Sequence, residues 1–284
     1  MIRQTWEETN LILAEAKRPV VAMGRDYPPG TVVPPHEHPH AQLVHASAGV
    51  MRVTTETGIW VVPPQRAVWV PAHVTHSVAM HGRVEMRTVY IAPAAAEGLP
   101  GACCVVAVPA LLRELILRAM TLPAEYDEGS PAARVMDLIL DEIRALPAAP
   151  LHLPQGQDAR LRRVTTALLD APGDSRGFEV WAKTAGASPR TLARLFQSET
   201  GLSFRAWRQQ ARMLQALTWL AEGRPVTGLA LDLGYDSPSA FVAAFKRAFG
   251  VTPARYFKGQ VSNEGSHAGS ARDATGGTGV ERDA

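Results

Sequence analysis

The chain contains few cysteines, and it has no apolar stretch long enough to cross a membrane. Its two cysteines, Cys103 and Cys104, are adjacent, which suits neither a disulfide framework nor a metal-binding knuckle. We therefore expect both thiols to be reduced and buried in a strand. The longest apolar stretch, residues 102–112, is interrupted by Pro109 and followed by Arg113, so it falls well short of the roughly 20 residues that a membrane span requires.

The N-terminal segment MIRQTWEETN does not show the order of basic and then apolar residues that is typical of a signal peptide. We therefore expect a cytoplasmic protein with no membrane partner. With 284 residues, the chain is long enough to form two domains, each with a core of its own.

Charge is divided unevenly along the chain. Residues 155–258 carry 15 Lys and Arg against 8 Asp and Glu, a net charge of +7, whereas residues 1–154 carry 12 against 15 and are acidic. A basic domain is what a polyanion-binding surface needs, although charge alone fits RNA or a membrane surface equally well.

A degenerate internal repeat near the C-terminus narrows the choice between DNA, RNA and a membrane surface as the binding partner. GASPRTLARLFQSETGLSFRAW, which begins at Gly186, recurs as GYDSPSAFVAAFKRAFGVTPARYF, which begins at Gly234. Each copy combines a Gly-containing turn, a Ser-Pro helix start and a helix with apolar residues at i and i+4, which is the pattern of a helix-turn-helix unit. Such a repeat means that one supersecondary unit is used twice. Two such units side by side predict a DNA-binding domain.

The N-terminal half has the composition of a β domain. Residues 20–91 are rich in Val, Trp and Thr, are punctuated by Pro-Pro and Gly, and alternate in character at residues 50–54 and 68–70. This pattern predicts a small antiparallel sandwich or barrel. The two cysteines would lie at its end.

A helical region is expected next. Apolar faces run through residues 111–119 and 135–146, on either side of a breaker at residues 128–131. Each stripe either packs on its own domain or pairs with a second chain, and both interpretations stay open. Residues 147–156, rich in proline, are expected to form an interdomain linker. Residues 259–284 are poor in apolar side chains and are expected to be disordered.

Histidines are concentrated in the β domain, where seven of the nine lie between His36 and His81. Alternation along a strand puts His36 and His38 on the same face. The stretch GTVVPPHEHPHAQ, which leads to Gly49, resembles the first cupin motif, and PAHVTH, which ends at His76, resembles the second. On that resemblance three histidines occupy metal-ligand positions: His36, His38 and His76.

The chain departs from the cupin pattern at two positions. Gln42 stands where a carboxylate is usual, and His73 replaces the usual glycine of the second motif. An amide is a weak, neutral ligand, so a metal would bind less tightly here than in a site with a carboxylate, and redox catalysis is less well supported. Three interpretations stay open: a divalent metal, which is the one cofactor indicated, a polar lining for a ligand pocket, or surface imidazoles near the mouth of the barrel. The remaining histidines of the stretch are not expected to be ligands: His40, His45, His73 and His81.

The two halves together resemble the AraC/XylS family of bacterial transcription regulators, in the branch with an N-terminal cupin-like effector domain. The resemblance is strongest over residues 180–257, where A-x3-G-x-S-x-R-x-L-x-R-x-F-x4-G precedes FKRAFGVTPARYF. It implies an α+β protein in which a cupin-like β-barrel is followed by an all-α DNA-binding domain with two helix-turn-helix units. The expected divisions are residues 1–100 for the cupin-like effector domain, 101–154 for a helical dimerisation and linker region, 155–258 for the DNA-binding domain, and 259–284 for the tail.

The resemblance also implies that the two units, joined by a helix from Phe204 to about Glu222, enter adjacent segments of the major groove. Because the apolar side chains of each recognition helix point inward, the outward positions are left for DNA. In the first helix these are Arg190, Ala193, Arg194 and Gln197. In the second they are Ser239, Ala240, Ala243 and Lys246, followed by Arg247.

The two recognition helices offer different chemistry. Arg194 can address guanine O6 and N7 with two parallel bonds, or it can hold a phosphate instead. Arg190 and Gln197 are the next candidates for base reading. The second helix offers few donors, so we expect Lys246 and Arg247 to contact phosphates and the alanines to touch thymine methyl groups.

Three functions stay open. The first is a sequence-specific, DNA-binding transcription regulator, controlled by a small ligand or metal at the cupin domain; its partners would be double-stranded DNA, a small-molecule effector, RNA polymerase and a second copy of the chain. The second is a metal-dependent cupin enzyme with a helical appendage. Gln42 and the basic repeat argue against that enzyme, and we expect no catalytic residues. The third is a regulator whose cupin domain is only a dimerisation scaffold.

Overall fold

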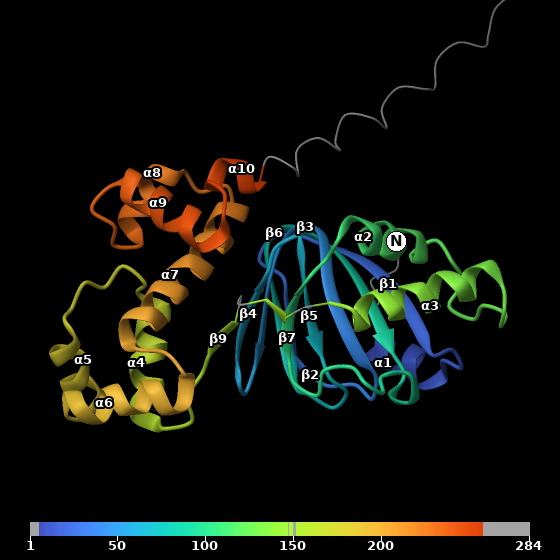
Figure 1. Ribbon diagram of the computed structural model, residues 1–284, viewed down its shortest axis with the longest axis horizontal. Coiled ribbons are helices and arrows are strands. Elements are labelled where there is room, and N and C mark those ends of the chain that lie inside the picture. Colours follow the sequence, from blue (N-terminus) through green and yellow to red (C-terminus); the bar gives the residue numbers. More distant parts are fainter. Residues whose placement is uncertain (1–5, 147, 150–151, 258–284) are drawn as a thin grey trace, which may run out of the picture.

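The computed structural model describes residues 6–146, 148–149 and 152–257, and it shows a sheet-rich half followed by a helical half (Figure 1). The tail expected to be disordered, residues 259–284, lies outside the described residues. Each helix in the described part of the chain is too short or too polar to cross a membrane.

Antiparallel strands in the N-terminal half form a single sheet. In the described residues they are β1 (Val20–Tyr27), β2 (Val32–His36), β3 (Ala41–Thr55), β4 (Gly58–Val62), β5 (Arg66–Val70), β6 (His76–Ile91), β7 (Cys104–Ala107), β8 (Ala148–Ala149) and β9 (His152–Pro154). The main path runs β1-β6-β3-β5-β7-β8, while β2 pairs with β6 and β4 pairs with both β3 and β9.

The two longest strands, β3 and β6, hold the sheet together. They pair with each other along most of their length, and each pairs with a different neighbour at its two ends. The first part of β3 pairs with β5 and the last part with β4. Between these parts the register shifts at Ala46/Ala48 and again at Ala48/Val50. Such bulges bend a strand, and residues from both ends, such as Val44 and Val53, share one core.

The sheet is not closed into the barrel that the sequence predicts. Its main path ends at β1 on one side and at the two-residue strand β8 on the other. β2 contains Pro34 and Pro35. Proline has no N–H to donate, so β2 can serve as an edge strand but cannot continue the sheet on both of its sides.

Two helices cover one face of the sheet. α2 (Ala110–Ala119) and α3 (Pro131–Arg144) occupy the two stretches predicted to be helical. Their buried residues, among them Ile116 and Ile139, pack with Leu43 and Trp69 of the sheet. Most of both apolar stripes therefore packs on its own domain, while Leu111 and Leu138 of the same stripes stay exposed.

The expected division at residue 100 differs from the structure. The region 101–154, predicted to be helical and then a linker, contributes β7, β8 and β9 to the sheet, where they pair with β5, β7 and β4 respectively. Cys104 begins β7, but both cysteines are free and only half-buried, so the expectation of burial is wrong. The reason is that Val105 and Val106, rather than the thiols, occupy the buried positions of this short strand.

Two short elements were not predicted. Helix α1 (Trp6–Glu15) precedes β1, and Leu13 of this helix packs against Val21 and Tyr90. A 3-10 turn, η1 (Pro93–Ala95), follows β6.

Helices make up the C-terminal half. They are α4 (Ala159–Asp170), α5 (Phe178–Ala185), α6 (Pro189–Leu195), a π-helical turn η2 (Phe196–Thr200), α7 (Phe204–Ala221), α8 (Val226–Asp232), α9 (Pro238–Phe249) and α10 (Pro253–Phe257). α5 and α6 form the first helix-turn-helix unit, α8 and α9 the second, and α7 runs between the two groups (Figure 1).

The repeated residues of the two units begin and end their helices. Ser188 and Ser237 each accept a backbone N–H bond at 3.1 Å from the third residue that follows, which caps α6 and α9, and a proline occupies the next position in both. Gly186 ends α5 and Gly250 ends α9 with positive φ angles of 70° and 79°. These are the conformations that glycine adopts without strain.

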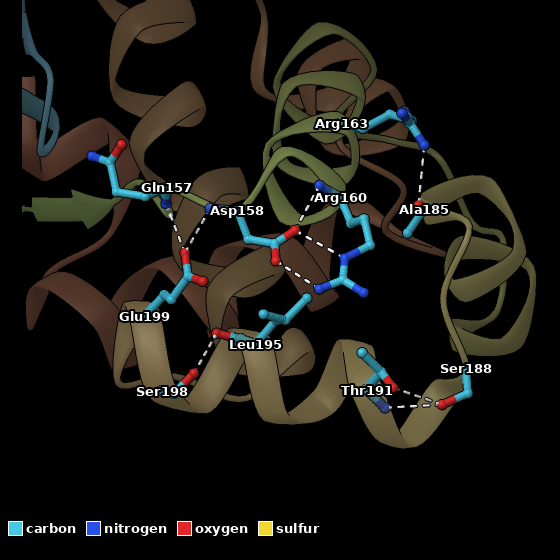
Figure 2. A network of polar contacts seen from close by, with 10 residues as sticks. All are labelled: Gln157, Asp158, Arg160, Arg163, Ala185, Ser188, Thr191, Leu195, Ser198 and Glu199. Atoms are coloured by element: carbon cyan, nitrogen blue, oxygen red, sulfur yellow. Dashed lines mark hydrogen bonds and ion pairs between the residues drawn. The ribbon is translucent and has the colours of Figure 1, made fainter.

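Polar contacts also join the first unit to the start of the helical half, as Figure 2 shows. The carboxylate of Glu199, at the end of the first unit, accepts N–H bonds from Gln157 and Asp158 at 2.6 and 3.0 Å. Asp158 in turn caps α4 and pairs with the guanidinium of Arg160. These bonds satisfy backbone N–H groups ahead of α4 that have no intrahelical partner.

Helix α7 docks on the sheet of the N-terminal half. The indole N–H of Trp207 donates to the carbonyl oxygen of Pro154 at 2.9 Å, and the Gln210 amide donates to the carbonyl of His152. At the other end of α7, the carboxylate of Glu222 lies 2.7 Å from Nδ1 of His81 on β6. The helix that joins the two units is therefore held by the sheet at both ends.

We expect Gly82→Ala to weaken this docking. Gly82 has φ +73°, and a Cβ there would lie 2.6 Å from the carbonyl oxygen of Ala221 at the end of α7. Gly30 is the matched control, because it has φ +76° and its Cβ would meet no atom within 4 Å. Both variants lose about 1–2 kcal/mol to the left-handed backbone, so only Gly82→Ala adds a clash. Thermal unfolding should show a clearly lower Tm for Gly82→Ala, and equal Tm values would contradict the docking.

Candidate functional site

Three histidines meet at the junction of β2 and β6. His36 ends β2 and pairs in register with His76, the first residue of β6, while His38 lies in the loop that follows β2. One ring nitrogen from each of the three lies within 4.8 Å of the others. His38 and His76 are buried and His36 is half-buried. The His-x-His spacing and the cross-strand pairing together produce the cluster.

Each imidazole is held by a backbone carbonyl. Nδ1 of His36, His38 and His76 lies 2.8, 2.6 and 2.9 Å from the carbonyl oxygens of Pro34, His40 and Val74. A carbonyl oxygen can only accept, so each Nδ1 carries the hydrogen and each Nε2 is left with a lone pair. Metal-binding histidines are oriented in the same way.

Burial keeps these rings neutral at neutral pH. Desolvation lowers the pKa of His36 and His38 below the usual histidine value and lowers the pKa of His76 to about 4. Nε2 of His76 is buried and has no hydrogen-bond partner among the described residues. A neutral imidazole whose Nε2 has no partner, as in His76, is the form that ligates a metal.

The amide of Gln42 faces the cluster with its oxygen. The Thr88 hydroxyl donates to the carbonyl of Leu43, so it can only accept from Gln42, whose Nε2 lies 2.9 Å away. The amide oxygen is thereby directed at Nε2 of His38, 3.1 Å away. A neutral His38 has one N–H, which the carbonyl of His40 takes, so two acceptors face each other. A cation bound to both atoms would make this contact of two acceptors favourable. Their separation of 3.1 Å is close to the roughly 3.3 Å between adjacent ligands of a tetrahedral zinc.

The cavity beside the cluster is small. Its volume is about 30 Å³, and its described lining includes Arg25, Tyr27 and Tyr90 besides the histidines and Gln42. Thr9 of α1 also lines it, so α1 covers one side. This room holds one or two water molecules, which fits a metal ion with a small ligand and does not fit a large organic effector.

The other histidines of the stretch lie outside the cluster. His45 is fully buried, and its Nδ1 donates to the carbonyl of Arg66. His73 is exposed and has φ +60°, a left-handed conformation that glycine adopts without strain. His81 pairs with Glu222 of the helical half, a contact that the sequence did not indicate. His40 is buried next to the cluster.

The sequence analysis also missed Arg25, Thr88 and Tyr90. Thr88 and Tyr90 are two residues apart on β6, so they share the face on which Gln42 lies. Both hydroxyls accept a hydrogen bond from the amide nitrogen of Gln42. In the sequence, the alternation of Thr88 and Tyr90 with apolar neighbours was the signal that could have placed both on one face of a strand. Arg25 comes from β1, and only the pairing of β1 with β6 brings it to the cavity.

The outward positions of the helix-turn-helix units are exposed. In the first unit the exposed residues include all four expected ones, and Leu192, Leu195 and Phe196 are buried. Gln197 lies in the π-helical turn η2 rather than on α6, and its amide donates to the carbonyl of Gly201. In the second unit all five expected positions are exposed: Ser239, Ala240, Ala243, Lys246 and Arg247.

Two family models match the chain. The AraC-like ligand binding domain matches residues 18–171, and a helix-turn-helix domain matches residues 181–259. The HTH-type transcriptional regulator NimR of Escherichia coli is 37% identical over 223 residues, which cover 78% of this chain and 81% of NimR. This chain belongs to the AraC family of transcriptional regulators. Its sheet-rich half is the ligand-binding domain of such a regulator, and its helical half is the DNA-binding domain.

Other matches are more distant. The arabinose operon regulatory protein of E. coli is 30% identical over 147 residues, which cover 51% of this chain and 49% of that protein. ToxT from Vibrio cholerae O395, a solved structure, is 9% identical, covers 84% of this chain and 97% of its own, and has a TM-score of 0.37.

We expect the purified protein to retain a divalent metal, and His38→Ala to lose it. One ring nitrogen from each of the three histidines lies within 4.8 Å of the others, and removal of one imidazole leaves two. His73→Ala is the control, because His73 is exposed and lies outside the cluster. Metal analysis after growth in metal-replete medium checks this. Metal-free wild-type protein, or equal metal content in His38→Ala, would favour a purely polar pocket.

A second prediction concerns the pH dependence of stability in the metal-free protein. Burial lowers the pKa of His45 to about 4, whereas the unfolded chain titrates near the usual 6.5. Between these values the unfolded state binds a proton that the folded state excludes, so stability falls as the pH drops from 6.5 to 4, by roughly 3 kcal/mol for this residue. Urea unfolding of His45→Gln should therefore show a flatter pH dependence than the wild type. His73→Gln, at an exposed position, should leave the dependence unchanged; an unaltered slope in His45→Gln would contradict a neutral buried imidazole.

Proposed function

We propose that this AraC-family regulator is controlled by a divalent metal, or a ligand carried on that metal, at His36, His38 and His76. The observation that supports it is the contact of two acceptors, Nε2 of His38 and Oε1 of Gln42, at 3.1 Å. Burial and the neighbouring imidazoles disfavour a proton at this contact, so a metal ion is the cation that fits. Three imidazoles would fill three positions of a tetrahedral metal, and the fourth, held by the weak amide ligand of Gln42, would be the position that another ligand takes.

On the DNA side, we assign base reading to the first unit. Arg190, Arg194 and Gln197 are exposed there, and a guanidinium can bond guanine with two parallel hydrogen bonds. Neither Arg190 nor Arg194 forms an ion pair among the described residues. Ala193 would sit against the base edges. This surface would specify sequence.

The second unit has the chemistry of a positioning surface. Lys246 and Arg247 lie in the last turn of α9 and would contact phosphates. Ser239, Ala240 and Ala243 offer one hydroxyl and two methyl groups, which suit a phosphate oxygen and thymine methyls.

The route from the metal site to the DNA-binding half runs along β6. His76 begins this strand, and His81, five residues further on, pairs with Glu222 at the end of α7. α7 joins both units, so a ligand that favours one position of β6 would bias their relative placement. This is a coupling between two sites through one packed element.

The remaining partners belong to the same proposal. As a cytoplasmic regulator that performs no catalysis, the protein would have four partners: double-stranded DNA, a small-molecule effector, RNA polymerase and a second copy of the chain. For the second copy, Leu111 on α2 and Leu138 on α3 are 52% and 40% exposed on the helices that cover the sheet.

Arg194→Ala and Lys246→Ala should affect DNA binding in different ways. Arg194→Ala should cost about 1–3 kcal/mol on the preferred duplex and little on scrambled DNA, because a bidentate base contact is lost. Lys246→Ala should weaken binding to both duplexes alike and lower the slope of log affinity against log salt by about one, because one phosphate contact is lost. The measurement is a salt titration of both variants on both duplexes.

Arg134→Ala is the control for the removal of one positive charge, since Arg134 is exposed on α3 of the ligand-binding domain. It should leave both affinities unchanged. Equal weakening of the two duplexes by Arg194→Ala would show that Arg194 holds a phosphate.

A further inference from the structure

A second cavity lies between helix α3 and the sheet. Its volume is about 200 Å³, and its described lining includes Leu43 of β3, Trp69 of β5, Val106 of β7 and Ile143 of α3. All four side chains are buried. Leu43 follows Gln42 directly along β3, and Gln42 lines the cavity of the histidine cluster. Because successive side chains of a strand point to opposite faces, the two cavities lie on opposite faces of the sheet.

The segment that follows η1 forms one wall of this second cavity. Gly98, Leu99 and Pro100 of that segment line it. The indole N–H of Trp69 donates to the carbonyl oxygen of Pro100 at 2.7 Å, which ties the segment to β5. The one polar atom of the Trp69 side chain is thereby paired, so a ligand would meet only its apolar ring.

The volume of the cavity selects the size of its ligand. An apolar cavity of about 150 Å³ stays dry and binds benzene, so a volume of about 200 Å³ holds one six-membered ring with a small substituent. The cavity beside the histidine cluster, with about 30 Å³, is too small for such a ring. An organic ligand of the ligand-binding domain therefore fits between α3 and the sheet, and not beside the histidines.

Arg144 adds a polar group to the lining. Its guanidinium pairs with the carboxylate of Asp141, three residues earlier on α3, at 3.3 Å, and it donates to the carbonyl oxygen of Ala95 at 3.4 Å. A guanidinium carries more N–H groups than these two contacts use. It can therefore also donate to an oxygen atom on a bound ring.

The surroundings of Arg144 disfavour an anionic ligand. Asp141 already supplies a negative charge to the guanidinium. Arg144 also lies in the last turn of α3, where the carbonyl groups of a helix carry partial negative charge. Burial of a carboxylate beside apolar side chains adds a desolvation cost. An uncharged ring with one oxygen substituent therefore suits this cavity better than the corresponding acid.

We propose that the cavity between α3 and the sheet binds the organic ligand of this domain, and that the ligand is an uncharged molecule with a single six-membered ring and one oxygen substituent, which accepts a hydrogen bond from Arg144. The inference goes beyond the proposed metal site and does not depend on it, because His36, His38 and His76 lie on the other side of the sheet.

The test is a titration of the full chain, followed by fluorine NMR, with 4-fluorophenol and with 4-fluorobenzoate at neutral pH. A chelator is present throughout, so that the histidine cluster holds no metal. The two probes share a fluorinated ring and differ in charge, since a phenol is protonated at this pH and a carboxylic acid is not. The wild type should bind 4-fluorophenol more tightly than 4-fluorobenzoate by about tenfold or more.

Leu99→Trp tests the place of the ligand. The larger side chain fills the cavity, so the affinity for 4-fluorophenol should fall by about tenfold or more. Leu111→Trp is the matched control, because Leu111 is 52% exposed on α2 and lies outside the described lining. It should keep the wild-type affinity.

Arg144→Met tests the polar contact, because it removes the donor and keeps a long side chain. It should weaken the binding of 4-fluorophenol by about fivefold, as expected for the loss of one hydrogen bond, and should leave the binding of fluorobenzene, which has no oxygen, unchanged. Arg134→Met, at an exposed position of the same helix, is the control. Far-ultraviolet circular dichroism and Tm establish that each variant is folded before it is titrated.

The contrary outcomes are distinct. Failure of the wild type to bind 4-fluorophenol, or equal binding by the wild type and Leu99→Trp, would overturn the site. Binding of 4-fluorobenzoate that is as tight as that of 4-fluorophenol would overturn the uncharged ligand. Each of these results would leave the proposed metal site standing, because that site is tested by the metal content of the wild type and of His38→Ala.

Discussion

The pairing of β3 with β6 is the constraint on which both halves of the molecule depend. Its register puts Gln42 opposite Tyr90 and beside Thr88, which turns the amide oxygen of Gln42 toward His38. The same strand pair has two register shifts, so that strands at both of its ends contribute to one core. It also presents His81 to the helical half. A shift of one residue would turn each of these side chains to the opposite face.

The hydrogen bonds of the histidine cluster support its proposed role as a binding site. Buried polar atoms are costly unless they are paired. Here three Nδ1 atoms are paired with carbonyls, while Nε2 of His76 has no partner among the described residues and Nε2 of His38 faces another acceptor. The Nδ1 atoms are hydrogen-bonded to the backbone, whereas Nε2 of His38 and Nε2 of His76 lack a hydrogen-bond donor. A ligand bound at these two atoms would supply the missing contacts.

Local signals in the sequence predicted a large part of this structure. The repeated Ser-Pro and Gly positions are helix caps and turns, whose geometry depends only on neighbouring residues, so the starts of α6 and α9 followed directly. The His-x-His spacing likewise predicted that His36 and His38 share a face. The sequence has His73 where the motif usually has glycine, and the structure gives His73 a left-handed backbone, the conformation that glycine favours.

Long-range pairing was not predictable in the same way. Whether the sheet closes depends on which distant edges meet, and periodicity does not encode that, so the predicted barrel was wrong. Strand β9 lies in a proline-rich stretch that reads as a linker, and only its pairing with β4 makes it a strand. Arg25 and the His81–Glu222 contact were missed for the same reason, because each joins elements that are far apart in the chain.

The central claim is that the histidine cluster and the DNA-binding half are coupled through β6 and α7. The most direct measurement is the affinity of the full chain for its preferred duplex, obtained by selection with the purified protein, with Zn²⁺ present and after its removal by chelation. The account predicts a change of about fivefold or more in the wild type and none in His38→Ala. A DNA affinity that is the same with and without metal in a wild-type protein shown to bind Zn²⁺ would contradict it.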